Sequence, residues 1–172
     1  MRPSSKQLIA GIRWSFETYA VPDLTSRLGQ SAGRSILNLL DHLHVRVDVE
    51  GQLLMDDNQD MRSLFEELSV LLEPALENGA GPEIRGAAAE MKERIGKQYR
   101  SAGAYPTVDS LTEENEDLKR TLVRAIRAVQ EHRDGLPPDI YGEADQVTRA
   151  QLRRQLDREH RWIQPIMGKR PY

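Results

Sequence analysis

The sequence predicts an all-α protein, a bundle of five or six helices with short loops, and three observations support this. Aromatic residues make up only 5% of the 172 residues. Leu, Ala, Glu, Arg and Gln dominate the chain, and these residues favour helix over strand. Apolar residues recur at helical spacing, in segments separated by Gly and Pro. The length suits one domain, residues 1–172, with a core of its own.

Two helices are expected near the N-terminus. The first covers residues 5–20, where apolar residues share one side and Ser4 or Ser5 serves as the N-cap. The second covers residues 33–55 and is expected to turn an apolar stripe toward the core. That stripe comprises Ile36, Leu39, Leu40, Leu43, Val47 and Leu54.

A third periodic segment follows directly. The run 56–58, Asp-Asp-Asn, is a possible N-cap, and Asn78-Gly79 is a plausible C-terminal cap. Pro74 lies inside the segment and is expected to kink the helix or end it early. The sequence leaves open whether the second and third helices are separate or one bent helix.

Three further helices are expected in the second half of the chain. Apolar residues mark the fourth helix at 84–95, the fifth at 110–129 and the last at 143–163. The pattern Ser110-Leu-Thr-Glu113 is a capping box, which predicts that the fifth helix starts there. Pro165, Gly168 and Pro171 predict an irregular tail after the last helix.

Composition excludes several classes of function. The absence of cysteine excludes disulfides, thiolate metal sites and a cysteine nucleophile, and it fits a reducing compartment. The sequence contains no secretory h-region and no run of apolar residues long enough to span a membrane. A net charge of −3 argues against nucleic-acid binding by the whole protein. We therefore expect a cytoplasmic protein without a membrane or nucleic-acid partner, and no motif indicates a cofactor.

Charge is distributed unevenly along the chain. Residues 48–93, the acid-rich stretch, contain twelve acidic and three basic residues, a net charge of −9. Residues 146–172 contain seven basic and two acidic residues, a net charge of +5, so 143–172 reads as a basic C-terminal helix with an irregular tail. Either this helix docks on the acid-rich stretch, within one chain or across a dimer, or its arginines bind an anion. The candidate interaction residues are Arg149, Arg153, Arg154, Arg158, Arg161 and Trp162, with Trp162 either a core anchor or a protein-contact anchor.

Two acid-x-x-His pairs raise the possibility of a metal site. Asp41 and His44 share a face of the second helix, and Asp157 and His160 share a face of the last helix. The arrangement loosely resembles that of ferritin-like di-iron proteins, which use Glu-x-x-His in a helical bundle. Because both Asp residues project away from the predicted apolar stripes, the candidate ligands are His44, His160, Glu50 and Glu159.

Two polar residues fall within apolar arcs. Glu50 lies between Val47 and Leu54, and a buried carboxylate needs a partner; Arg46 is the local candidate. Glu50 is therefore either half of a structural ion pair or a catalytic acid. His132 extends the stripe of the fifth helix and is expected at its C-terminal boundary.

The N-terminal third carries a family resemblance. Residues 8–24, 36–44 and 50–54 resemble the opening helix pair of small, uncharacterised bacterial helical proteins, in which a proline joins two helices and the second ends near Glu-x-x-Leu-Leu. Those proteins are similar to accessory components encoded beside acyl-CoA dehydrogenase-like and aminoglycoside-phosphotransferase-like enzymes. The resemblance implies an accessory role and carries over no catalytic residue.

These observations support two hypotheses of different class. The first is a non-catalytic interaction protein or accessory subunit of a bacterial enzyme complex, with a protein partner or a homo-oligomer as its assembly. The second is a metal-dependent helical-bundle enzyme that uses His44, His160, Glu50 and Glu159 as ligands.

Overall fold

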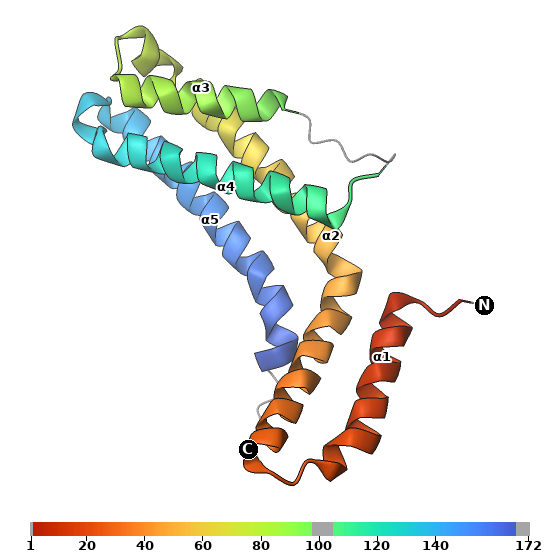
Figure 1. Cartoon of the computed structure of the whole chain (residues 1–172). Coiled ribbons are helices and arrows are strands. Elements are labelled where there is room, and N and C mark those ends of the chain that lie inside the picture. Colours follow the sequence, from red (N-terminus) through yellow and green to blue (C-terminus); the bar gives the residue numbers. More distant parts are fainter. Residues whose placement is uncertain (1, 98–104, 168–172) are drawn as a thin grey trace. The chain divides into compact units, whose positions relative to one another are not determined.

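The computed structural model describes residues 2–97 and 105–167, with the side chains of 161–167 excepted. Within these ranges it holds five α-helices and no strand, which confirms the predicted all-α fold (Figure 1). The helices are α1 Ser5–Ser15, α2 Arg27–Glu77, α3 Pro82–Gly96, α4 Val108–Glu131 and α5 Pro138–Met167. A π-helical turn, Phe16–Ala20, and 3-10 turns at Val21–Asp23 and Arg133–Gly135 complete the regular structure.

The chain divides into two compact units. Unit 1 comprises residues 1–50 with 157–172, and unit 2 comprises residues 51–156. The length alone predicts one domain.

The expected second and third helices are one continuous helix, α2, which answers the question that the sequence left open. The run 56–58 does not start a new helix, and the side chains of Asp57 and Asn58 bond to α4 instead. Asn58 Nδ2 donates to the carbonyl oxygen of Leu111 at 3.0 Å, and Asn115 Nδ2 donates to Asp57 Oδ2 and Asn58 Oδ1, both at 2.8 Å. These side chains therefore fix the register of α2 against α4 and leave the backbone helical.

The C-terminal end of α2 lies where the sequence predicts it. Pro74 lies inside the helix and does not end it. The backbone N–H of Ala80 donates to the carbonyl oxygen of Ala75 at 2.9 Å, and that of Gly79 donates to Leu76 at 3.3 Å, which is a Schellman cap. Gly79 has a φ of 88°, a conformation that favours glycine, so the predicted cap at Asn78-Gly79 is confirmed.

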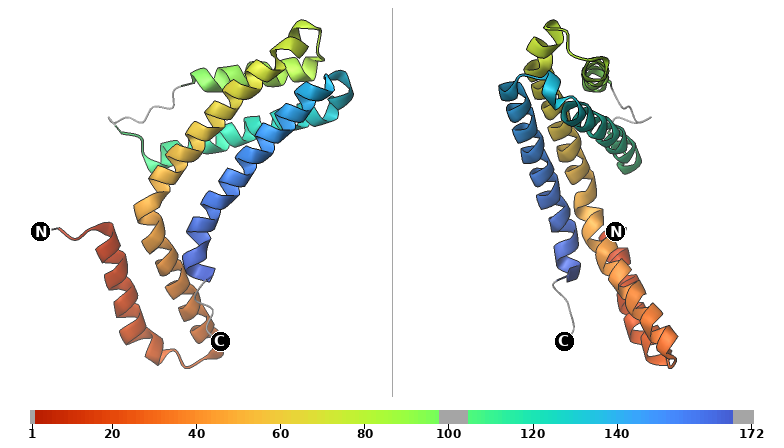
Figure 2. Two further views of the ribbon diagram at one scale, coloured as in Figure 1. Left: turned by 180° about the vertical axis from the view of Figure 1, so that it is seen from behind. Right: turned by 90° about the vertical axis from the view of Figure 1, so that its left-hand side faces the viewer.

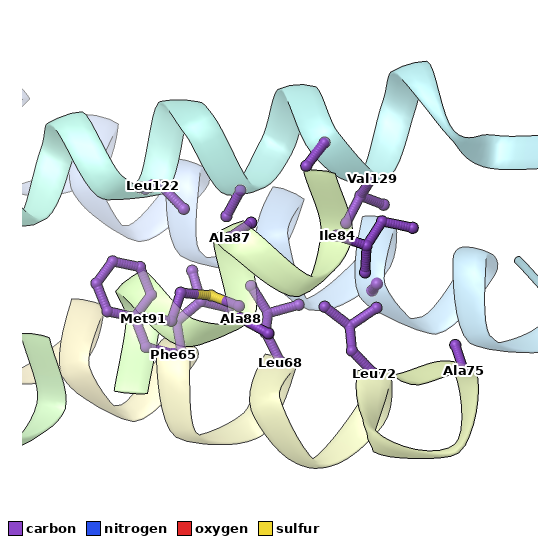
Figure 3. Close-up of a cluster of buried hydrophobic side chains, with 14 of the residues drawn as sticks. Phe65, Leu68, Leu72, Ala75, Ile84, Ala87, Ala88, Met91, Leu122 and Val129 are labelled. Atoms are coloured by element: carbon purple, nitrogen blue, oxygen red, sulfur yellow. The ribbon is translucent and has the colours of Figure 1, made fainter. Parts of the chain in front are cut away.

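The core of unit 2 lies where the second half of α2, α3, α4 and the first part of α5 meet. Figure 2 shows α2 and α5 of this unit running side by side in opposite directions, with α3 and α4 on one side of them. In Figure 3, apolar side chains of α2 point toward those of α3 and α4. Ala87 and Ala88 of α3 are buried, so small side chains let α3 approach closely. Phe65 and Met91 fill the centre and are fully buried.

The N-cap of helix α4 lies three residues before the one that the sequence predicts. The N-cap is Thr107, whose side chain accepts from the backbone N–H of Ser110, while Ser110 Oγ accepts from the N–H of Thr107. Ser110 is therefore the third helical residue of the capping box and not its N-cap. The prediction was wrong because Thr107 and Ser110 make the same reciprocal pattern one turn ahead of Ser110 and Glu113.

Replacing Thr107 with alanine is expected to lower the free energy of unfolding by about 1 kcal/mol, since the backbone N–H of Ser110 loses its acceptor. Ser110→Ala keeps the Thr107 acceptor and is expected to cost less. Urea denaturation of both variants measures the difference. A larger loss for Ser110→Ala would place the N-cap at Ser110 after all.

Helix α5 also differs from its predicted bounds of 143–163. It begins at Pro138, the first helical position, where a missing N–H costs no hydrogen bond. It extends to Met167 and so includes Pro165, which we expected to lie in the irregular tail. Residues 168–172 lie outside the described part of the chain.

Candidate functional site

The N-terminal part of unit 1 is a helical hairpin made of α1 and the first half of α2. Arg13 Nε donates to Asp41 Oδ1 at 2.6 Å, and Lys6 forms an ion pair with Asp48, so two bridges tie α1 to α2. The hydrogen bond with Asp41 raises the pKa of Arg13 above its usual value. At the turn, a Cβ on Gly33 would lie 2.7 Å from Leu24 Cδ1, so any other residue there would require the Leu24 side chain to shift.

This hairpin buries very little. Among residues 2–50, only Gly33 is buried. The expected core stripe of the second helix is mostly exposed: Leu39 is 61% exposed, Ile36, Leu43 and Val47 are 41–47% exposed, and Leu40 and Leu54 are half-buried. The prediction that this stripe faces the protein's own core was therefore wrong. Helical periodicity shows that a face is apolar and does not show what covers it.

The large apolar side chains that are exposed on the first half of α2 share one helix face. They are Leu28, Ile36, Leu39, Leu43 and Val47, here called the α2 stripe. Spacings of eight, three, four and four residues keep them within one arc of the helix. Between residues 28 and 47 the charged residues are Arg34, Asp41 and Arg46. The spacing places Arg34 and Asp41 outside this arc, while Arg46 lies at the C-terminal end of the stripe, where it forms an ion pair with Glu50. An apolar face of this kind is typical of the centre of a protein interface.

Helix α1 and the turn after it add further exposed apolar area. Leu8, Ile12, Trp14 and Tyr19 are each more than half exposed. The rings of Trp14 and Tyr19 pack edge to face with centroids 5.5 Å apart. A group of large exposed apolar side chains on one small unit is more typical of an interaction site than of incidental exposure.

A shallow groove runs between α1 and α2. It is lined by Ala10, Arg13, Trp14, Glu17, Asp41 and His44. Its charged groups are already engaged with each other, because Arg13 donates to Asp41 and also to Glu17 Oε2, at 2.5 Å. The groove therefore presents the Trp14 ring and His44 beside charged side chains that already pair with each other. This arrangement suits protein contact better than acid–base chemistry.

The candidate metal ligands do not gather into a site. Within the described ranges, no three His, Asp or Glu side chains are placed to hold a metal ion. His44 lines the groove, Glu50 forms an ion pair with Arg46, and His160 and Glu159 are exposed on α5. The metal hypothesis gains no support from this arrangement.

The two other candidate polar residues have structural partners. Arg46 and Glu50 form the predicted ion pair within α2, which favours the structural interpretation of Glu50. His132 is the C-cap of α4, with Nδ1 3.1 Å from the carbonyl oxygen of Ala128 and Nε2 3.2 Å from Glu83 Oε2. It lies at the helix boundary, as predicted.

The arginines of the last helix make mostly local contacts. Arg149 Nε lies 2.7 Å from Asp145 Oδ2 on the same helix. Arg154 donates twice to Gln151 Oε1, at 3.0 and 2.7 Å, and lies 3.5 Å from Asp60 Oδ2 in the acid-rich stretch. Arg153 is exposed and Arg158 half-buried. The side chains of Arg161 and Trp162 lie outside the described part of the chain.

Sequence reasoning missed Arg62, a side chain of unit 2 with several hydrogen bonds. Arg62 donates to Glu114 Oε1 from Nε and Nη2 at 2.9 and 2.7 Å. The same guanidinium donates to the carbonyl oxygens of Arg94, Ile95 and Lys97 at 2.7–2.9 Å, where α3 ends. It therefore joins α2, α3 and α4. The available signal was that Arg62 is one of only three basic residues in the acid-rich stretch and lies next to the core residue Met61.

Comparison of the chain with known protein families, with curated proteins and with solved structures gave no significant match. In the described part of the chain, no helix combines the length and apolar character that crossing a membrane requires.

Proposed function

We propose that this protein is a non-catalytic interaction protein, which associates with itself and serves as an accessory subunit of a larger bacterial enzyme complex. The α2 stripe carries the proposal, because a folded helical hairpin that leaves five large apolar side chains exposed needs a protein to cover them. The resemblance of residues 8–24, 36–44 and 50–54 to bacterial accessory components supports the same role.

The strength of such an association can be estimated from the exposed apolar side chains of the α2 stripe. Covering each of its five side chains from its present exposure contributes about 1 kcal/mol. Two copies together gain on the order of 10 kcal/mol, against an association cost of about 4–15 kcal/mol. The stripe alone therefore supports association of modest strength, and the exposed apolar side chains of α1 add to it.

Sedimentation tests the proposal directly. The protein is expected to sediment as an oligomer at concentrations between about 1 and 100 μM, and Leu39→Gln is expected to weaken this association about tenfold or more. Leu39 is largely exposed in the single chain, so the substitution is expected to change folding stability by less than about 1 kcal/mol.

Val70→Gln is the matched control, since Val70 is 68% exposed on the same helix but lies in unit 2. It is expected to leave the sedimentation behaviour unchanged. A protein that stays monomeric throughout the concentration range would contradict the self-association.

A further inference from the structure

We propose that two copies of this chain pair their α2 stripes in antiparallel orientation, about a two-fold axis that passes between Leu37 and Asn38. This inference rests on the proposed function and names the partner and the register of the contact. It concerns only the first half of α2, where the stripe is exposed.

The register follows from the spacing of the stripe. With the axis between Leu37 and Asn38, Leu28 lies opposite Val47 of the second copy, and Ile36 lies opposite Leu39. Ala32, which falls within the same arc, lies opposite Leu43, so a small side chain meets a large one. Every residue of the stripe thus finds an apolar partner, which is the self-complementarity that a two-fold interface requires.

A parallel pairing fits less well. It would set Ala32 against Ala32 and leave a gap between the Leu28 pair and the Ile36 pair. It would also place the two Arg46–Glu50 ion pairs side by side at one end of the stripe. In the antiparallel arrangement these pairs lie at opposite ends of a contact that is about 30 Å long, so like charges stay apart.

The chemistry of the stripe favours a second copy over an unlike partner. From Leu28 to Leu43 the stripe holds apolar residues and no charge that would select a charged partner surface, and Arg46 at its end is paired with Glu50 of the same helix. A contact of one helix face on each side is at the small end of protein interfaces. We therefore expect a dimer that dissociates in the micromolar range, which sets the concentration for the experiment.

Cysteine cross-linking tests the register, because the natural chain contains no cysteine. Leu28→Cys and Val47→Cys are made singly in the full chain, and each is oxidised alone and in a mixture of the two. The mixture is expected to form a disulfide-linked dimer that joins position 28 to position 47. Each variant alone is expected to form little, since the two copies of position 28 lie roughly 28 Å apart along the axis.

A mixture of Leu28→Cys with Val70→Cys is the matched control, as Val70 is exposed on α2 outside the stripe. It is expected to give no more cross-linked dimer than the single variants. Efficient cross-linking of each single variant with itself would overturn the proposal in favour of a parallel pair.

Sedimentation of the same samples tests the antiparallel register separately from the proposed self-association. Dimers without the 28–47 cross-link would overturn the antiparallel register and leave the proposed self-association standing. A monomer would contradict both. If, in addition, Leu39→Gln lowered the melting temperature of that monomer, the stripe would be covered by another part of the same chain.

Discussion

Replacing Phe65 with alanine is expected to lower the free energy of unfolding by about 3–5 kcal/mol, the range for truncation of a buried aromatic side chain. Phe65 is fully buried on α2, within the cluster that joins α2, α3 and α4 (Figure 3). Its neighbours include helix residues fixed by backbone hydrogen bonds, so the site cannot collapse to fill the cavity.

Chemical denaturation monitored by circular dichroism measures this effect. Val70→Ala is the control, since Val70 lies on the same helix and is 68% exposed. Its change is expected to stay within about 0.5 kcal/mol. A loss below about 1 kcal/mol for Phe65→Ala would mean that the core of unit 2 is packed differently from the arrangement described here.

The helices of this protein were predictable because local signals determine them. Periodic apolar residues marked α1, α3 and α4, and the glycine at position 79 marked the end of α2. The local signals failed where side chains had two possible uses. Asp57 and Asn58 have the composition of an N-cap, yet they bond to α4, and this choice depends on tertiary contacts that the sequence does not display.

The sequence predicted which residues make up the candidate site, but it did not predict that these residues are exposed. The sequence located the apolar residues Ile36, Leu39, Leu43 and Val47 correctly on one face of a helix. Whether such a face packs inside the chain or against another chain depends on the length and position of the other helices. The same periodicity describes both cases, so it predicted a core where the structure shows an exposed surface.

Pairs of charged residues were predictable only within a helix. Arg46 and Glu50 lie one turn apart, so their ion pair could be inferred from spacing alone. The contact of Arg154 with Asp60 joins two helices, and the sequence indicated it only as an attraction between opposite charge blocks. The network around Arg62 involves backbone carbonyl groups, which leave no trace in a charge pattern.

That network makes Arg62 the most consequential charged residue in unit 2. Its side chain is 18% exposed and that of Glu114 is 12% exposed, so both charges are largely removed from water. Nε and Nη2 of Arg62 both donate to Oε1 of Glu114, and three more hydrogen bonds from the guanidinium satisfy carbonyl groups at the C-terminal end of α3. A cation at this end of a helix also interacts favourably with the helix dipole.

Arg62→Ala is therefore expected to lower the free energy of unfolding by about 2–4 kcal/mol, because it leaves the Glu114 carboxylate without its guanidinium partner and frees the α3 carbonyl groups. Arg62→Lys keeps the charge but not the planar fork, and we expect it to lose roughly half as much. Arg120→Ala, at an exposed arginine of α4, is the control and is expected to change stability by less than about 0.5 kcal/mol. Urea denaturation at neutral pH compares the three variants. If Arg62→Ala were as mild as Arg120→Ala, the guanidinium would not hold α2, α3 and α4 together.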